Sequence, residues 1–527
     1  MSDERRTPAS GNSVATLAQH EALVVSLLDP QRWPQGGGER RRIDTHISTV
    51  VLAGERAYKL KKPLDLGFLD FLSLDARERA CREELRLNGR LAPQIYLGVS
   101  AISGSIGSPQ VDGDGPVIDW AVCMRRFDPD AILANPEVPI DARLIESLAQ
   151  RVAAFHRDAA VCAPSEPYGD PAVALQPMQQ NFVQIRAAAA AGTGQLDTLE
   201  TWTQQRFERL EPVLRSRKAD GRVRECHGDL HLGNVALIAG EPVVFDAIEF
   251  NAGLRWIDTA NDIAFLTMDL HHRALPALAF RFLDTYLHES GDYAALGVLQ
   301  FYEVYRALVR AKIAAIRLQQ ELTPLERESA NGELVSYLDL AARLTAPARG
   351  GLVITHGASG SGKSHVTAGL PGDLRAVRLR SDVERKRLLG IDPHSDATDI
   401  GGYSSEVTER TYGRLADLAC TVIAAGYVAI VDATFLRAAQ RARFRALAAD
   451  LRVPFVIIDC DAPRTLLRDR IQRRRTAAGN VSDADLAVLD AQLATAEPLD
   501  EAEKAHSLTV GPEHPLPVER LRALLAG

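Results

Sequence analysis

Residues 227–234 read His-Gly-Asp-Leu-His-Leu-Gly-Asn, and this stretch decides how the N-terminal part of the chain is interpreted. Asp229 and Asn234 lie five residues apart, and Asp246 follows the apolar run Val243–Phe245, twelve residues after Asn234. Phosphoryl transfer from a nucleoside triphosphate needs a carboxylate for the acceptor hydroxyl and oxygen ligands for the metal on the phosphates. The three polar residues at these spacings predict such a centre. The alternative is that they cap turns, where Asp and Asn are common.

The spacing resembles the aminoglycoside phosphotransferase-like branch of the protein-kinase fold, which has His-Gly-Asp where protein kinases have His-Arg-Asp. The resemblance implies that Asp229 is the catalytic base and that Asn234 and Asp246 bind Mg²⁺. It also implies a two-lobed domain in which an upstream strand supplies a lysine for the phosphates of ATP. The chain departs from protein kinases because no Gly-x-Gly-x-x-Gly loop precedes that strand.

The resemblance to the kinase Val-Ala-Ile-Lys strand selects the phosphate lysine, and helix periodicity selects its partner. Ala57 and Lys59 share one face of the predicted strand 56–61, as in the kinase Val-Ala-Ile-Lys strand, so Lys59 is preferred to the lysines at 61 and 62. Glu84 lies on the inward stripe of the predicted helix 74–91 and is the expected partner of that lysine. An ordinary surface position is the alternative for each of the two residues.

Residues 357–364 read Gly-Ala-Ser-Gly-Ser-Gly-Lys-Ser, the complete pattern of a phosphate-binding loop, and follow the apolar strand pattern 352–356. The glycines let backbone N–H groups surround the phosphates at the start of the next helix. Lys363 is expected to reach the β- and γ-phosphates, and Ser364 to bind Mg²⁺. The residues expected to contact ATP are Gly357, Ser359, Gly360, Ser361, Gly362, Lys363 and Ser364.

The segment after this loop alternates strand and helix patterns, which indicates a parallel α/β sheet. The expected strands are 352–356, 376–380, 427–431, 455–459 and 507–510. The domain resembles the small P-loop kinases of the gluconate kinase, shikimate kinase, polynucleotide kinase and zeta-toxin group. The resemblance implies that Asp382 takes the acceptor proton and that Arg385 holds an anionic substrate. The alternative for Asp382 is the N-cap of the next helix.

Two further sets of residues are expected near the second centre. Asp432 ends the strand 427–431, where a carboxylate can orient the ligands of Mg²⁺. Arg470, Arg473 and Arg474 lie on one predicted helix and are expected to close over the triphosphate as a lid. An exposed basic helix face is the alternative for these arginines.

The predicted fold is a two-lobed kinase-like domain of the α+β class, followed by an α/β P-loop domain with a parallel sheet. A hairpin of strands 46–52 and 56–61 is expected, and a second strand pair is expected around the turn 112–116. Ala346–Gly351 is rich in Gly, Pro and small residues and is the expected linker. The expected domains are the N-terminal lobe 1–128, the helical lobe 129–346 and the P-loop domain 347–527.

Bulk composition limits the classes of partner. With 527 residues and 46% hydrophobic content, the chain is expected to form about three packed domains. The net charge of −8 disfavours nucleic acid, although it allows a local basic groove in the C-terminal domain. Six cysteines lack the spacing of a metal site, which favours a reducing cytoplasm. No apolar run reaches about 18 residues, so a soluble, cytoplasmic protein without a membrane segment is expected.

Residues 40–515 resemble bacterial fusion proteins in which an aminoglycoside phosphotransferase-like domain precedes an ATP-binding domain of the AAA ATPase or P-loop kinase type. The resemblance implies ATP and Mg²⁺ as cofactors of both halves. The expected acceptors are small-molecule hydroxyls, such as that of a sugar or aminosugar. Two other functions stay open for the C-terminal domain: sensing nucleotide to regulate the first centre, or phosphorylating a polynucleotide 5′-hydroxyl. The second is suggested by basic residues near Asp382, namely Arg375, Arg378, Arg380 and Lys386.

Overall fold

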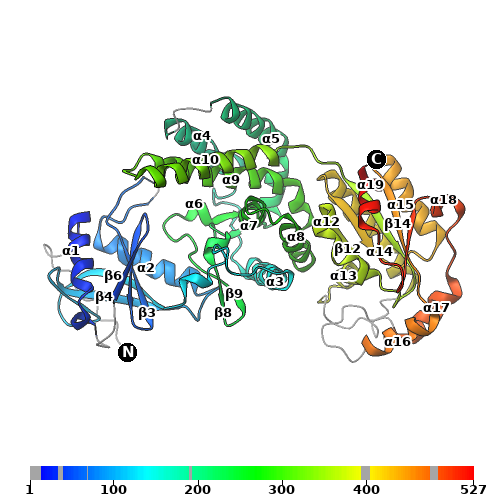
Figure 1. Cartoon of the computed structure of the whole chain (residues 1–527), viewed down its shortest axis with the longest axis horizontal. Helices are drawn as coiled ribbons and strands as arrows, with labels where there is room; N and C mark the ends of the chain where they lie inside the picture. Colours follow the sequence, from blue (N-terminus) through cyan, green and yellow to red (C-terminus); the bar gives the residue numbers. More distant parts are fainter. Residues whose placement is uncertain are drawn as a thin grey trace. The chain divides into compact units, whose positions relative to one another are not determined.

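The computed structural model describes residues 14–33, 40–67, 69–188, 193–392, 404–474 and 485–526 (Figure 1). The chain forms two compact units, each built from segments that are separated in sequence. Unit 1 comprises Met1–Ile140, Phe155–Gln176 and Pro212–Leu266, and unit 2 comprises Asp141–Ala154, Pro177–Glu211 and Thr267–Gly527. Within the described ranges, no helix combines the length and apolar character needed to cross a membrane.

Unit 1 begins with a six-stranded antiparallel sheet in the order β1-β2-β3-β6-β4-β5, drawn in blue and cyan in Figure 1. Its strands are β1 (Arg40–Asp44), β2 (Ser48–Ala53), β3 (Arg56–Lys61), β4 (Tyr96–Ser105), β5 (Ser108–Val111) and β6 (Val117–Arg125). The helix α1 (Leu17–Leu27) packs against β2 and β5, and α2 (Leu74–Asn88) packs against β4 and β6. The two helices therefore bury the apolar side chains of the sheet.

Local sequence explains two of the elements in unit 1 that carry predicted site residues, β3 and α2. Gly54 has φ +60° and makes the tight turn by which β2 enters β3, with Ala53 opposite Arg56. Ser73 starts α2, because its hydroxyl accepts the N–H of Ala76. The sheet core contains Leu23, Val51, Leu60 and Ile118, all fully buried.

The rest of unit 1 holds two short antiparallel strand pairs around the His-Gly-Asp stretch. β7 (Val223–Glu225) pairs with β10 (Trp256–Asp258), and β8 (Val235–Ile238) pairs with β9 (Glu241–Val244). The loop after β7 leads through the 3-10 turn η3 (Leu232–Asn234) into β8, and the helix α6 (Ala252–Arg255) precedes β10. These connections bring the loop after β7 and the segment after β9 to neighbouring positions.

Helices fill most of the chain between residues 142 and 344. They are α3 (Ala142–Asp158), α4 (Pro171–Ala188), α5 (Thr193–Ala219), α7 (Thr259–His272), α8 (Pro276–Ser290), α9 (Leu296–Leu318) and α10 (Pro324–Leu344). In unit 2, α9 packs along α10 and is buried over most of its length. A Thr323 capping box begins α10.

The C-terminal part of unit 2 is a five-stranded parallel sheet in the order β12-β13-β11-β14-β15. Its strands are β11 (Gly351–His356), β12 (Ala376–Arg380), β13 (Val428–Asp432), β14 (Phe455–Cys460) and β15 (Ser507–Val510). Its helices include α11 (Lys363–Thr367), α12 (Leu370–Leu374), α13 (Ser381–Leu388), α14 (Ser405–Ala424), α15 (Ala438–Leu451), α16 (Arg464–Arg474), α17 (Leu486–Thr495), α18 (Glu501–Lys504) and α19 (Val518–Ala526). The sheet is buried because α14 packs on β11, β12 and β13, α19 packs on β14, and α8 covers the edge strand β12.

The predicted fold class is confirmed: an antiparallel sheet with a helical lobe precedes a parallel P-loop sheet. The strand pair expected around the turn 112–116 is wrong in its pairing, because β5 and β6 flank that turn but both pair with β4. β4 closes a tight hairpin with β5, Ser105 opposite Ser108, and so lies between them. β1 was not expected, because its Arg-Arg-Arg-Ile-Asp sequence hides the alternation of a strand. Such charged sequences are typical of sheet edges.

Candidate functional sites

The loop after β7 has a conformation that glycine and a buried carboxylate impose. Gly228 has φ +87°, and a Cβ there would lie 2.7 Å from the carbonyl oxygen of Leu254, so a larger residue would be strained. Asp262 of α7 accepts the N–H groups of His227 and Gly228, at 3.0 and 2.8 Å. Both backbone N–H groups are thereby held in place. The backbone that precedes Asp229 is therefore rigid.

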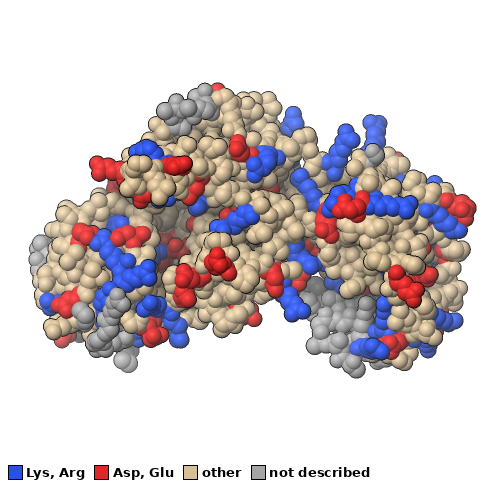
Figure 2. All heavy atoms as spheres, in the orientation of Figure 1, with Lys and Arg blue, Asp and Glu red and all other residues tan. Residues whose placement is uncertain are grey.

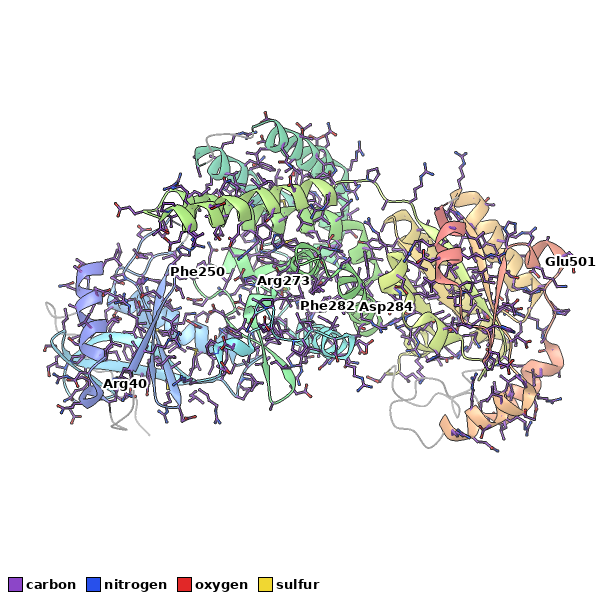
Figure 3. All side chains as sticks on the ribbon, in the orientation of Figure 1. Arg40, Phe250, Arg273, Phe282, Asp284 and Glu501 are labelled. Carbon is purple, nitrogen blue, oxygen red and sulfur yellow. The ribbon has the colours of Figure 1, made fainter. Side chains whose placement is uncertain are left out.

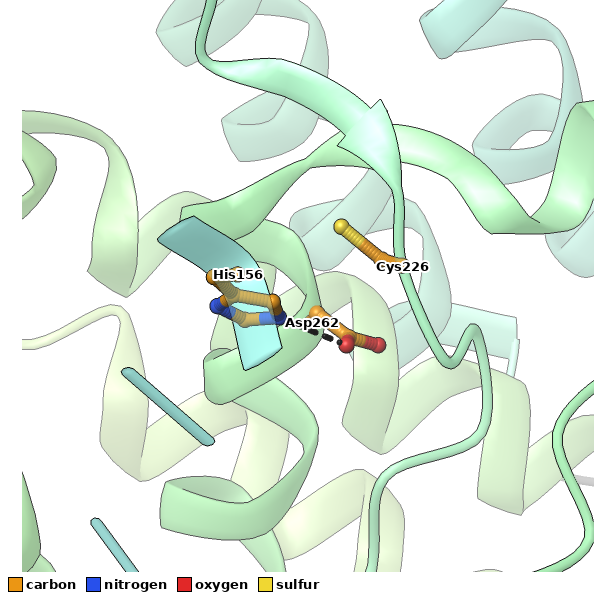
Figure 4. A group of neighbouring side chains, drawn as sticks. All are labelled: His156, Cys226 and Asp262. Carbon is orange, nitrogen blue, oxygen red and sulfur yellow. Dashed lines mark hydrogen bonds and ion pairs between the residues drawn. The ribbon is translucent and has the colours of Figure 1, made fainter. Parts of the chain in front are cut away.

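Asp262 also belongs to a buried group with His156 and Cys226, shown in Figure 4. Their ligand atoms lie within 4.8 Å of one another, which is compatible with a metal ion. Asp262, however, uses both carboxylate oxygens for backbone N–H groups, and His156 Nε2 lies 3.0 Å from the same carboxylate. Burial raises the pKa of the Cys226 thiol well above its usual range. We therefore interpret the group as support for the loop after β7 and not as a metal site.

Asp229 is held by two neighbours in the same loop, and its side chain is 36% exposed. The Asn234 amide nitrogen donates to the Asp229 backbone oxygen and to Oδ2, each at 2.9 Å. His231 Nδ1 accepts the N–H of Gly233 at 3.0 Å, so a neutral ring carries its proton on Nε2, which lies 3.3 Å from Asp229 Oδ2. The carboxylate is oriented while one side stays open to solvent. His231 is an addition to the residues selected from sequence.

The segment after β9 is anchored at each backbone position. Asp246 adopts a left-handed conformation with φ +64°, which is strained for a residue with a side chain. The Tyr96 hydroxyl accepts the Asp246 N–H at 3.1 Å, and the Asn88 side chain accepts the Ala247 N–H at 2.8 Å. His227 Nε2 lies 2.9 Å from the Phe245 carbonyl, and burial lowers the pKa of His227, which keeps the ring neutral. The loop after β7 and this segment are thus joined through His227.

Lys59 contacts its predicted partner Glu84 and also Asp246, which was predicted only as a magnesium ligand. Its ammonium group lies 2.9 Å from Glu84 Oε1 and 2.5 Å from Asp246 Oδ1. Burial opposes the charged form of Lys59, but the carboxylates of Asp246 and Glu84 raise its pKa above the ordinary value. Burial opposes the charged form of Glu84 too, and by itself would raise the pKa of this carboxyl. The adjacent ammonium groups instead lower it to about 2. The three residues therefore form charged pairs.

A second lysine, to which the resemblance to the kinase Val-Ala-Ile-Lys strand led us to prefer Lys59, joins the same network. Lys61 is fully buried and its ammonium group contacts Glu84 Oε2 and Glu249 Oε1. Burial raises the pKa of Glu249 above its ordinary value. The signals for this pair were present in sequence: Lys61 shares the face of Lys59, and Glu249 follows Asp246 in an Asp-Ala-Ile-Glu sequence.

The oxygen atoms near Asp246 fit a magnesium ion. Mg²⁺ prefers oxygen ligands and usually binds one or two carboxylates together with phosphates. The Asp246 side chain is 41% exposed, and the backbone of Asn234 lies beside that of the preceding residue, because the Phe245 N–H donates to the Asn234 carbonyl at 2.9 Å. Since the Asn234 amide nitrogen faces Asp229, its amide oxygen is the atom that could bind metal.

The loop 357–364 has the strained backbone that its glycines permit. Gly357, Gly360 and Gly362 have φ values of +134°, +86° and +103°. A Cβ on Gly357 would lie 2.5 Å from the Cys460 carbonyl, which no side chain could tolerate. Lys363 Nζ donates to the carbonyls of Gly357 and Ala358, at 2.9 and 2.8 Å. The loop is therefore wrapped around its own lysine.

Two helices contact this loop from outside. Arg470 of α16 donates to the Gly360 carbonyl at 3.1 Å, whereas Arg473 pairs with Asp469 on its own helix and is 79% exposed. Gln492 of α17 accepts the N–H of Ser359 at 2.9 Å. The structure thus brings Arg470 and an unpredicted residue, Gln492, to the loop. Arg474 lies at the end of α16, and its side chain is outside the described set.

The remaining predicted residues lie at the carboxyl ends of adjacent parallel strands, where α/β sheets bind ligands. Asp432 ends β13 opposite Arg380, the last residue of β12. Asp382 is the second residue of α13 and pairs with Arg385 at 2.7 Å. The N-cap alternative for Asp382 is wrong, because Arg380 occupies the N-cap position. Ser364 lies in the first turn of α11 and is half-buried.

Comparison with known sequences identifies the family. A family described as AAA domain matches residues 352–499. Over 449 residues the chain is 31% identical to the uncharacterized protein Rv2004c of Mycobacterium tuberculosis, which covers 84% of this chain and 87% of that protein. The uncharacterized protein Mb2027c of Mycobacterium bovis matches with the same values. The chain therefore belongs to the family of these mycobacterial proteins, and its C-terminal part is a P-loop domain.

Solved structures are similar to one part of the chain each. A candidate aminoglycoside phosphotransferase from Ralstonia eutropha aligns with 62% of this chain and 98% of its own length, at 13% identity and a TM-score of 0.37. A choline kinase from Cryptosporidium parvum aligns with 61% of this chain and 95% of its own, at 12% identity and a TM-score of 0.36. A gluconokinase from Sinorhizobium meliloti aligns with 33% of this chain and 90% of its own, at 18% identity and a TM-score of 0.23.

Proposed function

We propose that the chain is an ATP-dependent phosphotransferase with two nucleotide-binding centres, one in each unit. The observation that carries the first centre is the contact of Lys59 with both Glu84 and Asp246, close to a loop that orients Asp229. Phosphoryl transfer depends mostly on positioning and on charge stabilisation, and these are what fixed lysine, carboxylate and amide groups supply.

In the first centre each residue has a distinct task. Asp229 accepts a hydrogen bond from the acceptor hydroxyl and takes its proton as the phosphoryl group is transferred. His231 and Asn234 hold that carboxylate in one orientation. Lys59 exchanges its contact with Asp246 for the phosphates of ATP, while Glu84 keeps its ammonium group in place. Mg²⁺, when bound by Asp246 and Asn234, would neutralise charge on the phosphates.

In the second centre the backbone of the loop 357–364 binds the phosphates. Lys363 leaves the carbonyls of Gly357 and Ala358 when a phosphate replaces them as its partner. Ser364 and Asp432 supply oxygen atoms suited to Mg²⁺. Asp382 and Arg385 form the acceptor side, with Asp382 as the base. The ion pair between Arg385 and Asp382, at 2.7 Å, holds the carboxylate in place.

The acceptors are proposed to be small molecules with hydroxyl groups. Three of the four basic residues that suggested a polynucleotide acceptor are buried or contact other side chains of the protein. Arg378 pairs with the buried Asp284 of α8, Arg375 lies over the Tyr427 ring, and Lys386 is only 1% exposed. Asp284 is labelled in Figure 3. On the face shown in Figure 2, acidic and basic side chains are interspersed, which disfavours a strand-binding surface.

An ATP-consumption screen tests the proposal. The parent chain, Asp229→Ala and Lys363→Ala are offered sugars, aminoglycosides, nucleosides and oligonucleotides as acceptors. Each variant should lose one phosphorylation and retain the other. If Lys363→Ala only changes the rate of the Asp229-dependent reaction, the P-loop domain is a nucleotide-sensing regulator instead. ATP consumption that neither substitution affects would overturn the proposal of two centres.

A further inference from the structure

The Glu84 carboxylate is shared by two lysines, and each lysine holds a second carboxylate. We call Lys59, Lys61, Glu84, Asp246 and Glu249 the Glu84 network. Lys59 bridges Glu84 Oε1 and Asp246, whereas Lys61 bridges Glu84 Oε2 and Glu249. The network therefore attaches β3 and α2 to both ends of the segment 246–249.

The two halves of the network differ in exposure. Lys59 faces Asp246, whose side chain is 41% exposed, so this half opens towards solvent. Lys61 and Glu249 have side chains that are 0% and 4% exposed. A ligand can reach the outer half, while the inner half is sealed. Breaking a buried pair by removing one partner leaves an uncompensated charge, so the inner pair is held strongly.

The segment between the two carboxylates carries strain that must be held in place. Asp246 is in the left-handed region at φ +64°. Strained residues persist at functional sites only where the surroundings over-determine them. Here Tyr96 and Asn88 fix the backbone from one side, and Arg255 donates to the Glu249 carbonyl at 3.1 Å from the other. Lys61 adds the contact that fixes the Glu249 side chain.

Binding of ATP must disturb the outer half. On the proposed function of the first centre, on which this inference rests, Lys59 moves from Asp246 to the phosphates. Asp246 then loses the ion pair that holds its side chain against β3. The Lys61–Glu249 pair is two residues further along the same face of β3 and has no such exchange to make. It can keep the segment attached throughout.

We propose that Lys61 and Glu249 form a positioning pair that keeps Asp246 in its metal-binding conformation and Glu84 in place when Lys59 engages the triphosphate. The pair touches neither acceptor nor phosphate. It acts through Asp246, so its loss should weaken Mg²⁺-dependent nucleotide binding more than metal-free binding. Residues that orient a metal ligand in this way typically affect metal affinity by about 10–100-fold.

The test uses the full chain with Lys363→Ala, which weakens binding at the P-loop. The double substitution Lys61→Met with Glu249→Gln removes both charges and leaves no unpaired one. The matched control is Lys62→Met, because Lys62 points away to Asp44 and Thr45. Calorimetry measures the affinity for ATP with and without Mg²⁺. Amide hydrogen exchange of residues 243–250 is followed without nucleotide.

In the double variant we expect MgATP affinity to fall about 10–100-fold, with metal-free ATP affinity changed less than about threefold. Exchange at the Ala247 amide should be faster than in the parent and in Lys62→Met. A folded double variant with parental exchange and parental MgATP affinity would overturn the inference. If the double variant does not fold, Glu249→Asp replaces it. This substitution shortens the side chain by one methylene and moves its carboxylate away from Lys61. It must also lower the MgATP affinity and speed exchange at the Ala247 amide.

One more variant separates this inference from the proposed function. Lys59→Met should weaken ATP binding with and without Mg²⁺. If it leaves both affinities unchanged, the first centre does not bind ATP as proposed. Hydrogen exchange without nucleotide then decides whether Lys61 and Glu249 still position the segment 246–249.

Discussion

In the P-loop domain, the proposed phosphate-binding surface consists of the consecutive residues 357–364, whereas in the proposed centre of unit 1 the corresponding groups come from β3, α2, the loop after β7 and the segment after β9. The first surface is made of backbone N–H groups and the second of side chains. A surface of backbone groups needs glycines at fixed positions, so replacing one of these glycines should change the loop alone. Side chains from distant segments need a buried ion network, so their loss affects the fold as well. Four pairs of variants test this difference.

The largest effect is expected at Asp229. Asp229→Asn removes the base but keeps the shape and the contact with Asn234. General-base catalysis contributes about 10²–10⁴-fold, so the Asp229-dependent rate should fall by that factor with little change in melting temperature. The control is Asp220→Asn, an exposed aspartate in the same unit. A loss of less than about tenfold would exclude Asp229 as the base.

The second effect concerns the fold of unit 1. Glu84→Gln leaves Lys59 and Lys61 without their shared carboxylate and should lower the free energy of unfolding by about 3–5 kcal/mol. Glu83→Gln, at the preceding position of α2, breaks pairs in which the Glu83 side chain is 28% exposed and should cost about 0–1 kcal/mol. Chemical denaturation of the two variants measures the difference. Equal losses would mean that the Glu84 network does not stabilise unit 1.

The contribution of Glu84 to the free energy of unfolding has a defined pH dependence. The pKa of Glu84 is lowered to about 2 from an ordinary 4.5, despite burial, by Lys59 and Lys61. A lowered pKa contributes stability that is complete above the unfolded value and is lost as the pH falls through the folded value. The gap in unfolding free energy between the parent and Glu84→Gln should therefore narrow from about pH 4.5 downwards. A gap that widens on acidification would contradict the sign of this shift.

A smaller and purely local effect is expected at Gly357. The Cβ of Gly357→Ala would clash with the Cys460 carbonyl, and overpacking of this kind costs about 1–3 kcal/mol, or about 5–150-fold in ATP affinity at the P-loop. Gly390→Ala is the control, because Gly390 also has a positive φ, +71°, but no atom lies within 4 Å of its Cβ. Equal affinities in the two variants would show that the loop geometry is not limiting.

The smallest effect is expected at Arg470 and Arg473, two of the three arginines that the sequence predicts to form a lid. Arg470→Ala removes a hydrogen bond to the Gly360 carbonyl and should weaken ATP binding about 3–10-fold, within the usual value of one hydrogen bond. Arg473→Ala should change it by less than about twofold, because its pair with Asp469 is exposed. Titration of ATP against both variants measures this. A larger effect at Arg473 would support a lid that closes only on the bound nucleotide.

Sequence reasoning performed best where one segment carries the whole pattern. The strands of the P-loop sheet were predicted to within a few residues, because a buried parallel strand is a continuous apolar run between helices. It performed less well where pairing is non-local: β4 could not be placed between β5 and β6 from turn residues alone. The roles assigned to Asp229, Asp382 and the other site residues stay predictions, which the experiments above address.

The sequence by itself determined the two-part architecture, the glycine pattern of the loop 357–364 and the spacing of Asp229, Asn234 and Asp246. These are properties of residue type and distance along one chain. Only the tertiary structure decided that Lys61 and Glu249 join Lys59 in one network and that Gln492 reaches Ser359. The physical reason is that burial and partner choice depend on which segments fold together. Whether a lysine is an exposed charge or part of a buried ion pair depends on the carboxylates that the fold places against it.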